Sequence, residues 1–165
     1  THSPWRVIAT LVPADFVVPT EIELAGILLR PLGLNDLAPD FEAVVESRDR
    51  LIGLFSPDDP WPDGLTLHQD AVDLGWHEKE FQRRTSFAWG LWSGGSFDDG
   101  ARPYLGSAYL YPDPSGHSDV LAVHWIRSGM VKSSALPAFA LAWRRWIVED
   151  WPFEKVEFTS PEDRQ

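Results

Sequence analysis

Short runs rich in apolar residues, bounded by proline, glycine and polar residues, alternate along the chain with longer segments in which apolar residues recur every three or four positions. The short runs predict β-strands and the longer segments predict amphipathic helices. We predict strands at residues 21–31, 86–92, 104–111, 119–127 and 155–159, and helices at 37–47, 65–84 and 135–149. The order β-α-α-β-β-β-α-β predicts an α/β (α+β) fold with a mixed, mostly antiparallel sheet flanked by helices.

The region from 104 to 149 contains the pattern most suggestive of a binding site. A turn at 112–116 joins its two strands, and the polar connector 128–134 leads into the helix. A helix N-terminus that follows the end of a strand is a natural place for an anion or a phosphate. Elsewhere, three prolines within residues 57–62 predict a long loop before the second helix, and loops of this length often wall a substrate site.

Proline spacing and composition also indicate how the chain is organised. Residues 1–20 carry three prolines and no clear period, so we expect an extended arm that packs on the domain. Residues 21–160 form the single folded domain that this length favours, and residues 161–165 form a polar tail.

The chain is acidic, with 25 Asp and Glu against 14 Lys and Arg and a net charge of −11. This balance argues against a nucleic-acid surface and against binding to anionic membranes. The chain has no cysteine, which excludes disulfides and thiolate sites, and no apolar run approaches the length of a membrane helix. These features, with the absence of a signal-peptide pattern, predict a cytoplasmic protein. Its many aromatic residues predict a large core, and some of them can line a ligand cleft.

The order of the elements resembles the GNAT superfamily of N-acetyltransferases over residues 21–159. The resemblance rests on the LLRPL run at 28–32, the LGSAYL run at 105–110, the strand that ends in WIR at 125–127, and the helix that follows it. Two family features are missing: the usual glycine motif of the connector, and the helix and hairpin that usually follow the last strand. The resemblance is therefore to a shortened member of the family, and we expect the arm or a second copy of the chain, as a homodimer, to complete the fold.

The resemblance implies acetyl-CoA as cofactor and a small amine as substrate. It also implies a V-shaped gap between strands 119–127 and 155–159, where the cofactor's pantetheine arm pairs with backbone and its pyrophosphate lies on the connector. The cofactor-binding residues that it implies are Val123, Trp125, Arg127, Ser128, Gly129, Lys132, Ser133 and Ser134. We therefore expect an acetyl-CoA-dependent N-acetyltransferase. The alternative is a catalytically inactive domain of the same fold that binds a small molecule or a partner.

Two residues are candidates for acid–base catalysis. His124 is the titratable side chain inside its strand, and it can accept a proton from an amine. Glu78 interrupts the apolar row of the second helix, where a carboxylate directed into a cleft can act as a base or hold a cation. A hydrolase or lyase that uses His124 with Asp119 is a third reading, supported by residue identity alone. The spacing of the histidines supports no metal site.

Overall fold

The computed structural model describes residues 9–94, 102–131, 133 and 135–164. Its strands are β1 (Ile22–Leu24), β2 (Ile27–Pro31), β3 (Phe87–Ser93), β4 (Tyr104–Pro112), β5 (Val120–Ile126) and β6 (Val156–Thr159). They form one six-stranded sheet in sequence order. Every neighbouring pair is antiparallel except β5 and β6, which run parallel because helix α4 (Ala135–Asp150) connects them. The predicted mixed, mostly antiparallel α/β fold is confirmed.

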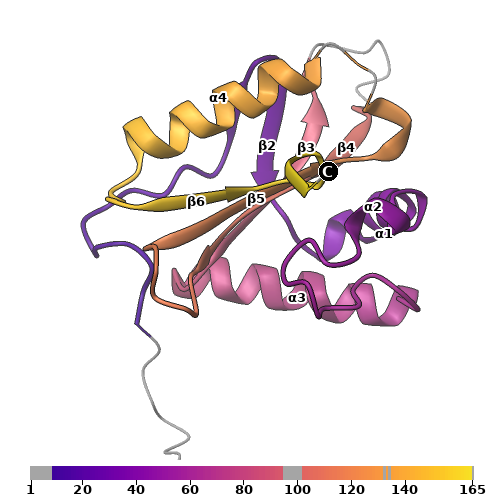
Figure 1. Cartoon of the computed structure of the whole chain (residues 1–165), viewed down its shortest axis with the longest axis horizontal. Coiled ribbons are helices and arrows are strands. Elements are labelled where there is room, and N and C mark those ends of the chain that lie inside the picture. Colours follow the sequence, from indigo (N-terminus) through magenta and orange to yellow (C-terminus); the bar gives the residue numbers. More distant parts are fainter. Residues whose placement is uncertain (1–8, 95–101, 132, 134, 165) are drawn as a thin grey trace, which may run out of the picture.

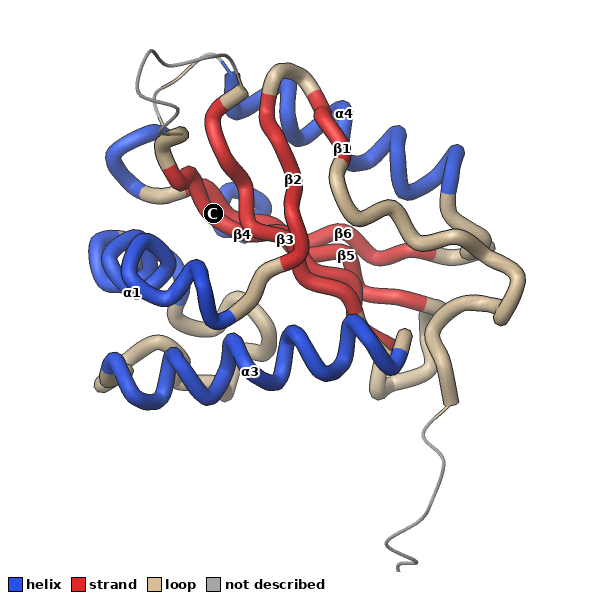
Figure 2. The backbone as a smooth tube through the Cα atoms, turned by 180° about the vertical axis from the view of Figure 1, so that it is seen from behind, coloured by secondary structure: helices blue, strands red, loops and turns tan. Residues whose placement is uncertain are grey.

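The sheet lies between two helical layers. Helix α4 covers one face, and α1 (Leu37–Glu46), the short α2 (Arg48–Leu51) and α3 (Leu67–Arg83) cover the other (Figure 1). The view from behind shows the strands curling between these layers (Figure 2). Among the described residues, no helix combines the length and hydropathy that crossing a bilayer requires.

One predicted element is wrong in its extent. The single strand expected at 21–31 is a hairpin of β1 and β2, joined at Ala25 and Gly26. Both turn residues have positive φ, 50° and 80°, which is the geometry of a tight hairpin turn whose twist matches the paired strands. An Ala-Gly pair between apolar residues is a weak turn signal, because alanine seldom takes positive φ.

Each face of the sheet carries its own apolar cluster, as strand alternation requires. Under α4, Trp89, Phe139 and Trp143 are almost fully buried. Under α1 and α3, the buried set includes Leu74, Tyr109 and Trp125. Successive residues of β5 therefore serve opposite faces of the sheet.

Local signals fix the start of α3. The Gln69 backbone N–H donates to Thr66 Oγ1 at 3.1 Å, and Thr66 N–H donates to Gln69 Oε1 at 3.0 Å. This capping box satisfies backbone N–H groups at the start of α3, the helix that supplies one wall of the site.

The last pairing between β5 and β6 joins Val123 to Thr159. Beyond it, the chain leaves the sheet and forms a short 3-10 helix, η3 (Pro161–Arg164), whereas β5 continues to Ile126. Residues 124–126 thus extend past the end of β6, whose four residues all pair with β5. The strands do not splay apart: β6 ends beside the part of β5 where the family resemblance implies a gap.

Candidate functional site

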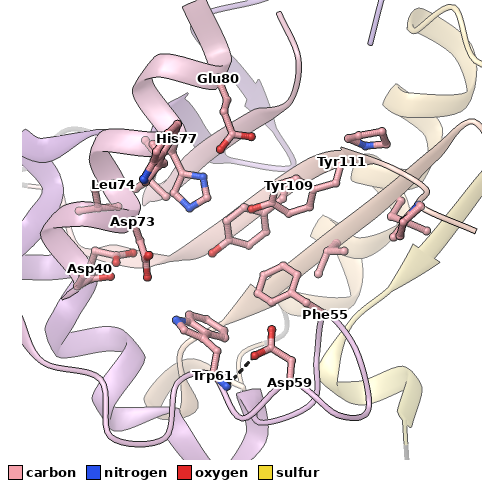
Figure 3. Close-up of a pocket in the computed structure, with 17 residues that line it drawn as sticks. Asp40, Phe55, Asp59, Trp61, Asp73, Leu74, His77, Glu80, Tyr109 and Tyr111 are labelled. Atoms are coloured by element: carbon pink, nitrogen blue, oxygen red, sulfur yellow. Dashed lines mark hydrogen bonds between the residues drawn. The ribbon is translucent and has the colours of Figure 1, made fainter. Parts of the chain in front are cut away.

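A cavity of about 490 Å³ opens on the α3 face of the sheet. Its floor is Tyr109 and Tyr111 of β4, its α3 wall includes His77, and the opposite wall carries Phe55 and Trp61 from the proline-rich loop (Figure 3). The loop predicted at 48–66 is wrong at its start, because α2 occupies 48–51, and its remainder contributes a wall of the cavity. The size is that of a site for a small organic molecule.

The lining of this cavity is strongly acidic. It contains five carboxyl side chains and, among its described lining residues, no Lys or Arg; the five are Asp40, Asp59, Asp70, Asp73 and Glu80. Burial and the neighbouring Asp40 and Asp59 raise the pKa of Asp73 above its usual value. The cavity therefore has a negative potential that attracts cations.

Two of these carboxyl groups, Asp40 of α1 and Asp70 of α3, are hydrogen-bonded to each other. Both residues are 3% exposed. Burial, together with the charge of Asp40, raises the pKa of Asp70 to about 9, so this pair shares a proton at neutral pH. The Tyr104 hydroxyl donates to Asp40 Oδ1 at 2.5 Å, and Ser107 lies 2.7 Å from the same hydroxyl.

His77 lies in the same cavity, beside Tyr109 at 5.6 Å between ring centroids. Burial lowers the pKa of His77 to about 4, so its imidazole is neutral at pH 7. Its Nδ1 is buried without a hydrogen-bond partner, and so is Asp70 Oδ2. Two buried polar atoms in one cavity thus lack the partner that such atoms normally have.

A second cavity, of about 340 Å³, lies on the other face, between α4, the end of β6 and η3. His124 lines it and packs edge-on against Phe139 at 5.5 Å between ring centroids. Burial lowers the pKa of His124 to about 4, so this histidine is also neutral. The predicted catalytic His124 therefore lies one residue beyond the last pairing of β5 with β6, on the opposite face of the sheet from His77.

The connector that follows β5 is the segment that the resemblance assigns to the pyrophosphate of acetyl-CoA, so its hydrogen bonds show whether it fits that group. Its described N–H groups are already bonded within the chain. Ser128 N–H donates to Ser47 Oγ at 2.9 Å, and Gly129 N–H donates to Glu46 Oε2 at 3.1 Å. Ser133 N–H donates to the Met130 carbonyl at 3.0 Å. The largely apolar second cavity fits an acyl-pantetheine arm, but the connector, arranged in this way, does not fit a diphosphate.

Glu46 is the residue that fills the connector. Besides Gly129 N–H, it accepts from Arg127 Nε at 2.9 Å, and the Arg127 guanidinium also contacts Glu42 at 3.3 Å. The hydrogen bond from Arg127, and then the one from Gly129 N–H, lower the pKa of Glu46. Glu46 is therefore ionised at neutral pH. A carboxylate thus holds the N–H and the guanidinium that the resemblance assigns to a phosphate.

The other residues predicted from sequence lie in several places. Val123 lines the first cavity, and Trp125 is buried with its Nε1 donating to the Tyr109 hydroxyl at 2.9 Å. Ser133 Oγ accepts from Ala135 N–H at 3.2 Å, at the start of α4. Lys132 and Ser134 lie outside the described residues.

Glu78, the second catalytic candidate, has a structural partner. Its Oε1 accepts from Leu34 N–H at 2.7 Å. Glu78 lines a separate cleft beside Arg30 and Gly33, and it lines neither of the two cavities described above. The structure therefore does not bring Glu78 and His124 together. Within the described ranges, no group of three or more His, Asp or Glu side chains is arranged to hold a metal ion.

Sequence reasoning missed the acidic residues of the first cavity and His77. Asp70, Leu74 and His77 lie at spacings of four and three, so they share one helix face, and the apolar member marks that face as inward. A carboxyl and an imidazole on an inward helix face are the sequence pattern that could have predicted a polar site on this side of the sheet. Asp40 gave no comparable signal, because its partners come from another helix and from β4.

The sequence matches no protein-family model and no curated protein. Solved acetyltransferase structures resemble the fold. A ribosomal-protein-S5-alanine acetyltransferase from Vibrio fischeri aligns with a TM-score of 0.57 at 9% identity, over 79% of this chain and 68% of that one. FdhC, a nucleotide-linked sugar GNAT, aligns with a TM-score of 0.56 at 15% identity, over 86% and 72%. RimL, a ribosomal L7/L12 acetyltransferase, aligns with a TM-score of 0.54 at 12% identity, over 83% and 69%. The chain therefore has the fold of the GNAT superfamily of acetyltransferases.

Proposed function

We propose that this chain is an acetyl-CoA-dependent N-acetyltransferase that acts on a small amine, with the acidic cavity on the α3 face as the amine site. One observation carries the proposal. Val123 lines the first cavity, the next residue, His124, lines the second, and β6 stops pairing with β5 at Val123. Two cavities thus reach successive residues of β5 from opposite faces of the sheet, beside the end of β6. Transfer requires the acyl carbon and the amine nitrogen to meet at this point.

The roles that we assign to the chain's own residues follow from their chemistry. Asp59 and Asp73 attract the ammonium form of the amine, and the neutral His77 can accept the proton that the amine loses before it attacks an acyl group. His124 remains a proposed proton acceptor on the other face of the sheet. Acetyl-CoA, when bound, supplies the acetyl group as a thioester.

Release of free thiol from acetyl-CoA tests this function. Because the chain contains no cysteine, a thiol reagent reports the product coenzyme without background from the protein. We expect release that depends on an added amine, and a loss of activity in His77→Asn at unchanged protein fold. If no amine in a broad panel produces thiol above the rate without protein, the proposal is refuted.

The second candidate is a domain of this fold that binds a small molecule without catalysis. The specific observation in its favour is Glu46, whose carboxylate holds Gly129 N–H and Arg127. For a diphosphate to bind there, Glu46 must leave the connector, because two anions cannot share these donors.

Calorimetric titration with coenzyme A separates the two candidates. Glu46→Gln removes the competing charge, and Glu42→Gln is the matched control, since Glu42 also contacts Arg127 but has no bond to the described connector N–H groups. If the chain is the proposed enzyme, we expect the unmodified chain to bind coenzyme A and Glu46→Gln to bind it more tightly. Absence of binding in all three proteins, with an amine still bound in the acidic cavity, favours the second candidate.

A further inference from the structure

The acidic cavity has flat apolar surfaces as well as carboxylates. Phe55 lies edge-on to Trp61 and to Tyr109, with ring centroids 5.2 Å apart in both pairs, and Tyr109 and Tyr111 are stacked at 5.6 Å. In Figure 3, the faces of these rings border the same space from the loop side and from the sheet side. Such surfaces accept a planar apolar group by stacking, and their π-faces attract cations.

The carboxylates flank this aromatic space from two sides. Asp59 lies beside Trp61 on the loop side, where its Oδ1 accepts from Trp61 N–H at 3.0 Å, and Asp73 projects from α3 (Figure 3). Burial, and then the charges of Asp40 and Asp59, raise the pKa of Asp73, and no described Lys or Arg lines the cavity to offset these charges. A positive ligand charge relieves this repulsion.

A second, independent observation also indicates a ligand. Asp70 is 3% exposed and lines the cavity, yet its Oδ2 has no hydrogen-bond partner. His77 Nδ1, also buried in the lining, has none either. Within the described residues, the chain therefore leaves a polar atom of each of these two lining residues without the partner that such atoms normally have.

We propose that this cavity selects an organic cation that combines one ammonium group with a flat apolar body, such as an arylalkylamine. The ammonium pairs with Asp73 and Asp59, and the flat body lies against Trp61, Phe55 and Tyr109. Anions are repelled by the carboxylates, and a neutral ligand leaves those carboxylates desolvated and unpaired. The inference deepens the proposed function and rests on its assignment of this cavity to the amine, but binding is measured without any acyl donor.

Isothermal titration of the intact chain at pH 7 tests the selection. The probes are benzylamine, 2-phenylethylamine and tryptamine, each paired with the alcohol that replaces its amino group by hydroxyl, together with putrescine, a cation without a flat body. We expect at least one arylalkylamine to bind at least about tenfold more tightly than its alcohol, which corresponds to about 1.4 kcal/mol. We expect putrescine to bind more weakly than that amine.

Two variants locate the bound cation. Asp73→Asn keeps the shape of the lining and removes one charge, and we expect it to weaken amine binding about tenfold with little effect on the alcohol. Asp58→Asn makes the same change of charge on an exposed neighbour of Asp59 that does not line the cavity, and we expect no effect.

Three results overturn the inference: no arylalkylamine binds at millimolar concentration, amine and alcohol bind equally, or putrescine binds most tightly. None of these results refutes the proposed function, because the chain can still transfer an acyl group to a different amine. Conversely, amine binding without thiol release refutes the enzyme and leaves the cation selectivity intact.

Discussion

The carboxyl pair Asp40 and Asp70, in the lining of the acidic cavity, makes the stability of the fold depend on pH, and one substitution can remove this dependence. Asp70 has its pKa raised from 3.8 to about 9, mainly by burial and then by Asp40. Asp70→Asn replaces the protonated carboxyl with an amide of the same shape, whose N–H can still donate to Asp40. We expect the variant to fold and to lose most of the pH dependence that the pair creates.

The sign and size follow from proton linkage. Between pH 3.8 and about 9 the folded chain holds a proton on Asp70 that the unfolded chain has released. The free energy of unfolding therefore falls as pH rises through this window, by about 1.4 kcal/mol per pH unit for one proton. From pH 5.5 to 8.5 the full effect is about 4 kcal/mol, an upper figure because Asp40 shares the proton.

Urea unfolding of the unmodified chain, of Asp70→Asn and of one control variant at pH 5.5, 6.5, 7.5 and 8.5 measures the effect. Asp49→Asn is the control, since its side chain is 95% exposed on α2. We expect the stability of Asp70→Asn, relative to the unmodified chain, to rise steadily with pH, and that of the control to stay flat. Parallel pH profiles for all three proteins would refute a shared buried proton.

Three further substitutions test local parts of the same structure by urea unfolding. Tyr104→Phe removes the hydroxyl that donates to Asp40, so we expect a loss of about 1–3 kcal/mol at pH 7, and unchanged stability would contradict that hydrogen bond. Gly33→Ala places a Cβ against the Glu78 carboxyl and displaces it from Leu34 N–H, so we expect a loss of about 1 kcal/mol. Gly75→Ala meets no atom within 4 Å on α3, so we expect a gain of about 0.5–1 kcal/mol, and a loss would show that this helix position is not free.

The sequence alone was enough to determine the order and type of most elements. Periodicity and turn residues locate α3, α4 and the strands from β3 to β6, because each depends on neighbours only a few positions away. The capping box at Thr66 is equally local. The β1–β2 turn was missed because its signal, an Ala-Gly pair, is weak by itself.

Only the tertiary structure decided which side chains share a cavity. Asp40, Asp70 and Tyr104 come from three different elements, and burial, which no local pattern reports, raises the pKa of each. Likewise, the occupation of the connector by Glu46 depends on where α1 ends relative to β5, a long-range packing relation. Local chemistry fixes what a segment becomes, whereas packing between distant segments fixes which charges face one another and what they can bind.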